Sequence, residues 1–266
     1  MAERSAVAGR QGQELRPPSR CRPSSGSAAR TSWMDNGSMI ATIDVADIGI
    51  RSTLRALRHR PTPIDVPGLR WLDIAPAVSL ASKRPPGLRR AVLFAMWDDE
   101  NAAAAFADTH PLAARFAPNG FHAVLRPLRA FGTWPGLPDT VPRTRVTQHD
   151  GPVIVTTFGR LRMSQTLRFF RASRPAERAA IGADGFVWGT AAARPPFLAT
   201  LSVWNSDEAA AAYAYRDAHA GHPQAIARQR RKDFHHQSAF IRYAMVSTSG
   251  TLPGVAPLDS ASRESE

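Results

Sequence analysis

Histidines are the residues whose type and spacing point most directly to chemistry in this chain of 266 residues. His219 and His222 flank a break at Gly221-His222-Pro223 in a stretch that otherwise has a helical pattern. A histidine at such a break can direct its imidazole into the space between a helix and a sheet, and imidazole is a common ligand of metals and of haem iron. The alternative is a surface histidine beside a loop proline, and the residues alone leave both interpretations open.

Other reactive residue types form weaker patterns. His235 and His236 are adjacent and would point to opposite sides of a regular element, so they make a poor chelating pair and are expected to lead into the last strand. The single cysteine, Cys21, excludes internal disulfides and multi-cysteine metal sites. The sequence contains no phosphate-binding glycine loop, nucleophile elbow or HExxH motif, so it assigns no catalytic residue. Acidic residues stand where two helices are expected to start, and capping explains them: Asp98, Asp99, Asp207 and Glu208.

A segment that occurs twice must position these residues. Residues 91–136 and 197–254 each contain an apolar run ending in Trp, an acidic cap, an Ala-rich helix, a His-Pro pair and a closing Gly-Thr-x-Pro-Gly. Without a gap, the stretch from Trp97 to Phe106 aligns with the stretch from Trp204 to Tyr213. An internal repeat of this kind indicates a duplicated architecture.

The patterning predicts the order β-α-β-β-α-β in each half of the chain. We therefore predict an α+β fold in which two tandem ferredoxin-like (βαββαβ) repeats bury their apolar sheet faces against each other as an intrachain dimeric α/β-barrel. The paired Trp residues are expected to anchor the core. The strands are expected at 41–50, from 68 to about 78, 91–97, 121–131, 152–158, from 185, 197–204 and 239–248, and the main helices at 52–59, 98–108, 164–181 and 207–232.

Composition sets the expected boundaries of these parts. Residues 1–38 are rich in Ser, Arg, Gly and Ala, cannot bury enough apolar area to offset their ordering entropy, and are expected to be a disordered N-terminal extension. They resemble either a transit peptide or sequence upstream of a later start at Met34 or Met39. The first repeat is expected over 39–146, the second over 147–254, and a disordered tail over 255–266.

Charge and hydropathy limit the expected partners. The formal net charge is +12, but the Arg residues are scattered among Ala and Pro and no nucleic-acid-binding signature appears, so we expect no nucleic-acid partner. No window approaches the length of apolar sequence that would span a membrane. With one cysteine, the chain is expected to be cytoplasmic.

A spaced pattern in the second half resembles a known family. It resembles the C-terminal signature of the spheroidene monooxygenase (acyclic carotenoid 2-ketolase) family, and the similarity covers most of residues 40–250. The segment Leu167-Arg168-Phe169-Phe170 and the strand from Gly185 to Trp188 fit the same pattern. Its main elements are Val203-Trp204, Glu208-Ala209, Ala212-Tyr213-Ala214-Tyr215-Arg216, His222, Gln224-Ala225-Ile226, Phe234 and Ser238-Ala239-Phe240-Ile241-Arg242-Tyr243.

The resemblance implies a haem-dependent monooxygenase that installs a keto group on a linear carotenoid, using O₂ and an electron donor such as ferredoxin. It implies that His222 is the axial ligand of the haem iron. His219 is the alternative ligand, because two extra residues precede the His-x-x-Ala-Ile pattern in this chain. A hydrophobic substrate would be reached by peripheral membrane contact, and an oligomer is compatible with such a barrel.

Three other functions fit the same expected fold. These are a cofactor-independent oxygenase of the same barrel superfamily, a haem dehydratase on that fold, and a ligand-binding barrel without catalysis. A Soret band in the purified protein distinguishes the haem-dependent functions from the others.

Overall fold

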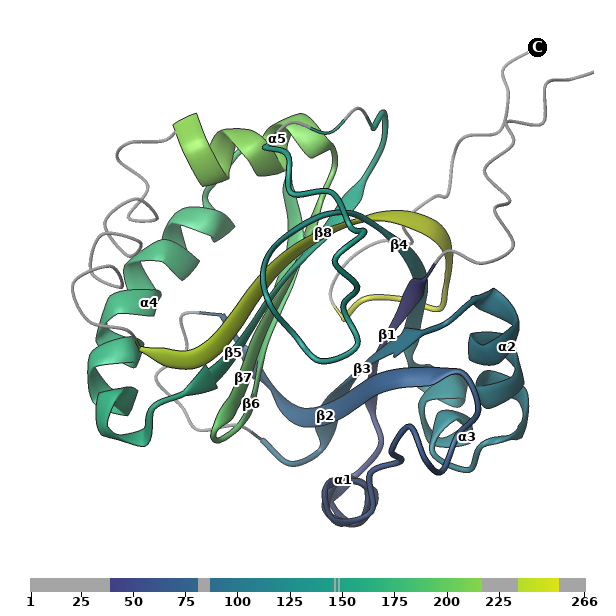
Figure 1. Ribbon diagram of the computed structural model, residues 1–266. Helices are drawn as coiled ribbons and strands as arrows, with labels where there is room; N and C mark the ends of the chain where they lie inside the picture. The colour runs from purple at the N-terminus through teal and green to yellow at the C-terminus, as the bar shows by residue number, and fades with distance from the viewer. Residues whose placement is uncertain (1–38, 81–86, 146, 148, 217–233, 254–266) are drawn as a thin grey trace, which may run out of the picture. The chain divides into compact units, whose positions relative to one another are not determined.

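The computed structural model describes residues 39–80, 87–145, 147, 149–216 and 234–253 (Figure 1). The expected disordered segments at both ends of the chain lie outside the described residues, as do His219, His222 and most of the helix expected over 207–232.

The first half of the described chain follows the predicted order, with boundaries that move by one to three residues. β3 is buried along its whole length except at its first residue, as its near-continuous apolar sequence predicts for a central strand. Asp99 is the N-cap of α2, because its carboxylate accepts a hydrogen bond from the Ala102 amide at 2.9 Å. The elements are β1 (Ile40–Asp47), α1 (Ile50–Arg58), β2 (Leu69–Ser79), β3 (Arg90–Trp97), α2 (Glu100–Thr109), α3 (Ala113–Phe116), the 3₁₀ turn η1 (Ala117–Asn119) and β4 (Phe121–Gly132).

The second half repeats this order with two differences from the prediction. Its last strand begins at His235 rather than at residue 239, because Gln237 and Ser238 already pair with the end of β5. Of the helix expected over 207–232, the described part is α-helical over Asp207–Ala211 and π-helical over Ala212–Arg216. The elements are β5 (Val153–Leu161), the 3₁₀ turn η2 (Met163–Gln165), α4 (Thr166–Ile181), β6 (Phe186–Arg194), β7 (Phe197–Trp204), α5 (Asp207–Ala211), the π-helical turn η3 (Ala212–Arg216) and β8 (His235–Ser249).

The eight strands form a closed antiparallel barrel in the order β1-β3-β2-β6-β7-β5-β8-β4. Within each half the fourth strand lies beside the first, followed by the third and the second, which is the ferredoxin-like arrangement. The predicted fold class is therefore confirmed.

Two junctions of unequal length close the barrel. At the first, β4 pairs with β8 along almost its whole length, from His122 opposite Ser249 to Gly132 opposite Ala239. At the second, only Ala77–Ser79 of β2 pairs with Thr190–Ala192 of β6. The two halves are thus joined firmly on one side and by a short ladder on the other.

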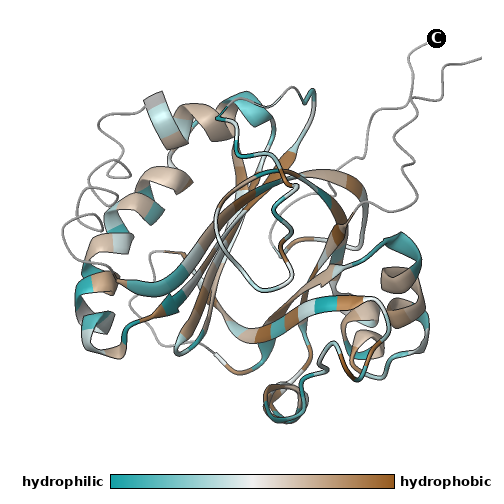
Figure 2. Cartoon of the chain, viewed as in Figure 1, coloured by the Kyte–Doolittle hydropathy of each residue, from teal (hydrophilic) through white to brown (hydrophobic). Residues whose placement is uncertain are grey.

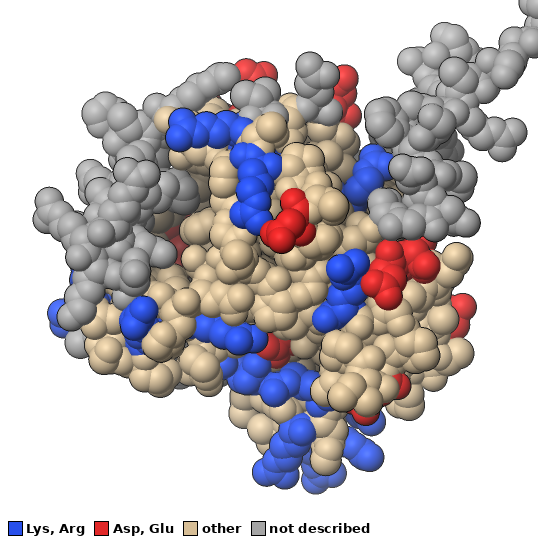
Figure 3. Space-filling model, in the orientation of Figure 1, with Lys and Arg blue, Asp and Glu red and all other residues tan. Residues whose placement is uncertain are grey.

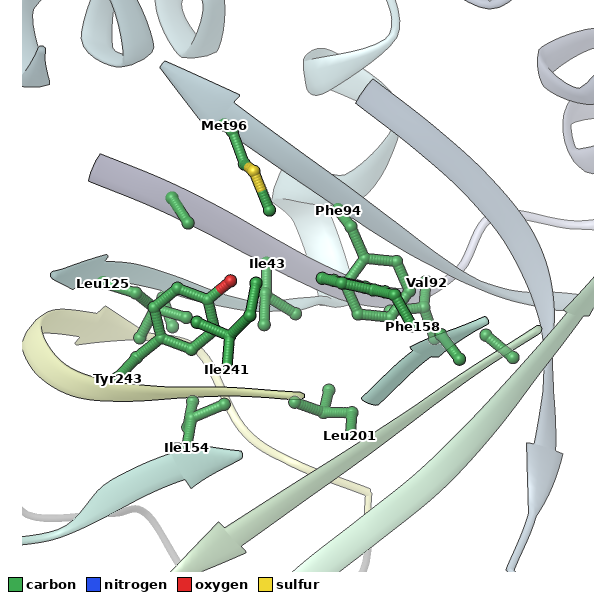
Figure 4. Packing of buried hydrophobic residues seen from close by; sticks show 14 of the residues in the cluster. Ile43, Val92, Phe94, Met96, Leu125, Ile154, Phe158, Leu201, Ile241 and Tyr243 are labelled. Atoms are coloured by element: carbon green, nitrogen blue, oxygen red, sulfur yellow. The ribbon is translucent and has the colours of Figure 1, made fainter. Parts of the chain in front are cut away.

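Side chains fill the barrel interior (Figure 4). Inward-facing residues of both halves meet there, among them Phe94 from β3, Phe158 from β5 and Ile241 from β8. The ring centroids of Phe94 and Phe158 are 5.2 Å apart in an edge-to-face arrangement. The interior is therefore a packed core, and space for a ligand must be sought on the outer faces of the sheets.

Helices cover both outer faces of the barrel, one set for each half (Figure 1). α1, α2 and α3 pack on the strands of the first half through a cluster that includes Trp97, Phe106 and Phe116. α4 and α5 pack on the strands of the second half through two smaller clusters centred on Trp204 and Leu198. Figure 2 shows the hydrophobic residues concentrated along the strands between these helices.

Candidate functional site

A pocket lies between α4 and the outer face of the second sheet. Its cavity volume is about 90 Å³, and the pocket is partly open to solvent. Its floor consists of small or apolar residues of four strands, β2, β5, β6 and β7, and its wall consists of residues of α4. The lining residues are Val78, Ser79, Thr157, Gly159, Phe169, Phe170, Ser173, Arg174, Glu177, Ala191, Ala192, Ala193, Leu198, Ala199, Thr200 and His235.

A small buried cluster fixes α4 over this floor. Leu161, Ala172, Leu198 and Phe234 are buried together, so the end of β5, the middle of α4, the start of β7 and the approach to β8 meet at one point. The Arg162 amide also donates a hydrogen bond to the Phe234 carbonyl at 2.8 Å. The pocket therefore has a packed base at one end, where displacing α4 would expose these apolar side chains.

His235 reaches the pocket from the first position of β8. Its ring meets Phe169 of α4 edge-on, with centroids 5.1 Å apart, so the imidazole bridges sheet and helix. Its neighbour His236 is exposed, as expected for adjacent residues of a strand. This agrees with the prediction that the two histidines point to opposite sides. Both were expected only to lead into the last strand, but His235 also lines the pocket.

Gly159 of β5 makes room for the His235 ring. A Cβ atom at Gly159 would lie 2.5 Å from Cδ2 and 2.6 Å from Nε2 of His235, distances that real Cβ contacts do not reach. Any larger residue at this position would displace the imidazole. The absence of a side chain at Gly159 thus creates the space in which this histidine lies.

The pocket wall also carries polar groups. The Ser173 hydroxyl is buried and has no hydrogen-bond partner among the described residues. Arg174 and Glu177 contribute charged side chains to the same wall of α4. Burial, aided by the charge of Glu177, raises the pKa of Tyr213 to about 12, and the Tyr213 hydroxyl donates to the Ala176 carbonyl at 2.8 Å. The phenol therefore stays neutral and holds η3 against α4.

The two ends of the segment that contains His219 and His222 both lie on this outer face. The described chain stops at Arg216 in η3, which packs beside α4, and resumes at Phe234 beside the pocket. Positions 219 and 222 themselves lie outside the described residues. The prediction that they bind haem remains a prediction.

A second polar cluster lies below α5 and η3, away from the pocket. Arg242 of β8 is buried and donates to the Asp207 carboxylate at 2.7 Å, and the hydroxyl of Thr147 donates to the other oxygen at 2.6 Å. Capping was the expected role of Asp207, and this is wrong. Ser206 is the N-cap, whose hydroxyl accepts from the Ala209 amide, while Asp207 forms a buried ion pair.

Arg129 of β4 extends this cluster. It stands opposite Arg242 in the β4–β8 ladder and is buried. Its guanidinium donates to the Tyr215 hydroxyl and to the Arg145 carbonyl, and it lies 4.5 Å from the centre of the Phe131 ring. The cluster ties the connector between the halves to η3, which gives it a structural role.

Three further observations concern other possible sites in the described part of the chain. No group of three His, Cys, Asp or Glu side chains gathers there in a way that would hold a metal ion. On the face shown in Figure 3, basic side chains outnumber acidic ones and gather at the lower end around α1, and large areas are uncharged. In the described ranges, no helix is both long and apolar enough to cross a bilayer.

The fold and the pocket define a duplicated ferredoxin-like barrel with a mainly apolar pocket under a helix of its second half. Residues 160–257, which contain this helix, match a family model described as a domain of unknown function (DUF3291). The chain is similar to spheroidene monooxygenase of Rubrivivax gelatinosus, with 33% identity over 174 residues. The resemblance to this family predicted from sequence is therefore supported. The match covers 64% of this chain and 65% of the relative, slightly less than two thirds of that protein's length.

Solved structures with a similar chain path have low sequence identity. Aldoxime dehydratase (OxdRE), crystallised with butyraldoxime, is 8% identical, with a TM-score of 0.47 over 78% of this chain and 79% of that one. The heme-degrading enzyme LmHde of Listeria monocytogenes is 13% identical, with a TM-score of 0.27 over 76% of this chain and 98% of that one. Such scores carry no argument about chemistry.

Proposed function

We propose that this protein is a haem-dependent monooxygenase that converts a hydrophobic, carotenoid-like substrate to a ketone, using O₂ and electrons from a donor such as ferredoxin. The observation that carries the proposal is the 33% identity with spheroidene monooxygenase over 174 residues. Because the match spans 65% of that relative, the activity of the whole relative is transferred here only as a proposal.

The chemistry of the pocket supports a bound haem. A haem needs an imidazole or another axial ligand, apolar contact for the macrocycle and polar or cationic groups for its carboxylates. Phe169 and Phe170 of α4 offer apolar surface, and Arg174 offers a cation on the same wall. His222, or His219 in its place, would supply the axial imidazole from the segment that joins η3 to β8. The described lining thus offers the apolar and cationic groups that a haem needs, and the imidazole ligand would come from residues outside it.

The bound haem would supply activation of O₂, and the protein would supply position and environment. The apolar floor formed by β6 and β7 excludes water and binds the hydrocarbon body of the substrate through dispersion and the hydrophobic effect. The packed base around Phe234 holds α4 and the start of β8 in register. The partly open side of the pocket allows a long substrate to extend beyond the protein, as transient contact with a membrane surface requires.

Absorbance of the purified full-length protein tests the proposal. Protein incubated with hemin and freed of excess by gel filtration is expected to show a Soret band with one haem per chain. His222→Ala is expected to abolish or strongly shift this band, while His219→Ala has the smaller effect. The far-UV circular dichroism of each variant checks that the fold is retained.

Three outcomes contradict parts of this proposal. A band that His219→Ala removes and His222→Ala leaves unchanged would move the ligand to His219. Haem uptake without NADPH- and ferredoxin-dependent oxygenation of a linear carotenoid would leave a haem protein of another activity, such as a dehydratase. A wild-type protein that never takes up hemin would refute the haem-dependent function and leave a cofactor-independent oxygenase or a ligand-binding barrel.

A further inference from the structure

We propose that His235 is the polar anchor of the α4 pocket, where its imidazole hydrogen-bonds the oxygen-bearing end of a hydrophobic ligand. The inference rests on the proposed function for the nature of that end, which is a ketone on a linear isoprenoid chain. It assigns a binding role to a residue other than the two candidate haem ligands.

The position of His235 is the first support. It lines the pocket together with small or apolar residues of four strands, such as Ala191, Ala193 and Thr157. Next to such a floor, an imidazole is a group that can both donate and accept hydrogen bonds. A pocket of this kind binds the body of a ligand by apolar contact and fixes its orientation through a few polar groups.

The fixed orientation of the ring is the second support. Phe169 of α4 meets the imidazole edge-on. The Cδ2–Nε2 edge of the imidazole lies where a side chain at position 159 would otherwise be. The histidine is therefore held between sheet and helix before a ligand arrives. A preorganised polar group contributes more to binding than a flexible one, because less conformational freedom is lost.

The chemistry of the ligand follows from this surface. The hydrocarbon chain would lie along the outward faces of β6 and β7, where Ala191, Ala193 and Leu198 present no charge. A carbonyl oxygen at its end would accept a hydrogen bond from the His235 ring. Arg174 and Glu177 stand on the α4 wall rather than on this floor, so they would flank the ligand without setting its depth.

A matched pair of ligands tests the anchor without any dependence on haem. The probes are pseudoionone, a linear conjugated isoprenoid ketone, and farnesene, a linear isoprenoid hydrocarbon. Both are titrated into the full-length protein and followed through the quenching of intrinsic tryptophan fluorescence. Loss of one hydrogen bond is expected to weaken pseudoionone binding to His235→Ala by about three- to tenfold, with farnesene binding unchanged.

One further variant and two controls separate the anchor from a general effect on the fold. Gly159→Ala retains the histidine but displaces its ring, so it should weaken pseudoionone binding in the same way. Gly182→Ala is its control, because an added Cβ there would lie 3.7 Å from the nearest atom. His236→Ala is the control for His235→Ala, because His236 is adjacent and exposed, and both controls should bind both probes as the wild type does.

The outcomes distinguish this inference from the proposed function. Equal weakening of both probes by His235→Ala would show a packing role and overturn the anchor, as would no weakening of either. A wild-type protein that binds neither probe overturns it too. If the wild type binds pseudoionone through His235 but never takes up hemin, the anchor stands and the haem-dependent function fails.

Discussion

Trp97 and Trp204 occupy equivalent places in the two halves of the barrel. Each is the last residue of the third strand of its half and is buried. Each indole packs on the aromatic that follows at the same spacing in the chain, with centroids 5.0 Å apart for Phe106 and 5.2 Å apart for Tyr213. The repeat seen in the sequence is therefore also a repeat of packing, which indicates that the two halves use one structural design.

Replacing either tryptophan should destabilise the protein to a similar extent. Trp97→Ala and Trp204→Ala each remove a fully buried aromatic and are expected to lower the free energy of unfolding by about 3–5 kcal/mol. Urea denaturation followed by circular dichroism measures the change. Met163→Ala, at a position that is 60% exposed, is the control and should change stability by less than about 0.5 kcal/mol. A tolerated substitution at one of the two positions would contradict the equivalence.

The glycines that begin the second strand of each half give a related prediction. Gly68 has φ +73° and Gly185 has φ +80°, and a Cβ at either position would overlap a helix residue, Ala102 or Ala209, at 2.4 or 2.5 Å. Ala at either position should therefore cost more than about 1 kcal/mol of stability. Gly87→Ala, which would meet nothing within 4 Å, is the control in thermal unfolding. Melting temperatures that match the wild type at position 68 or 185 would refute the prediction.

The ion pair of Asp207 and Arg242 should be costly to break. The two side chains are 9% and 5% exposed, so Asp207→Asn leaves a buried guanidinium without its counter-charge. We expect a loss of about 3–5 kcal/mol in urea unfolding. The exposed pair of Asp139 and Arg143 is the comparison, where Asp139→Asn should cost no more than about 1 kcal/mol. The double variant Asp207→Asn/Arg242→Met should be more stable than Asp207→Asn alone. If the losses measured for Asp207→Asn and Arg242→Met simply add in the double variant, the two side chains are not coupled.

His122 should make stability depend on pH near neutrality. Its imidazole lies 2.7 Å from the Asp44 carboxylate, and this hydrogen bond raises the pKa of His122 above its ordinary value of 6.5, against the opposing effect of burial. The folded state thus holds this proton more tightly than the unfolded state does. The pair stabilises the fold fully below pH 6.5, and this contribution is lost as the pH rises through the raised pKa.

Asp44→Asn tests this dependence. Proton NMR titration of the His122 ring should give a lower pKa in the variant, and its melting temperature should fall less between pH 6 and pH 8 than that of the wild type. A wild-type pKa below 6.5 would refute the assignment.

The sequence predicts the elements well because their signals are local. The apolar run that ends at Trp204 defines β7 to the residue, and the acidic residue before an Ala-rich stretch marks the start of α2 at Asp99. The partner of Asp207 was missed for the opposite reason. Arg242 lies 35 positions further along the chain, and only the closed barrel brings the two together.

The role of His235 was also hidden from the sequence. It depends on a register shift between Arg160 and Leu161 of β5, which places His235 opposite Leu161 on the outer face, and on the missing side chain of Gly159. Because His235 and His236 are adjacent, the sequence predicted that their side chains point in opposite directions. No local pattern reveals which of the two faces a helix. The available signal was a glycine inside a strand, since such a residue often marks a close approach of another group.

The short ladder between β2 and β6 sets where the barrel would open first. In the described chain, the backbone ladder on that side pairs only Ala77–Ser79 with Thr190–Ala192, beside an ion pair of Arg194 and Asp73, whereas β4 and β8 are paired along almost all of β4. Local fluctuations should therefore part the wall between β2 and β6, and backbone amides there should exchange with deuterium sooner than those between β4 and β8. Val78, Ala191 and Ala192 line both this ladder and the α4 pocket. Local separation of β2 from β6 would widen the pocket at one end. The least stable part of the barrel wall would thus also let a long, rigid ligand enter and leave the pocket.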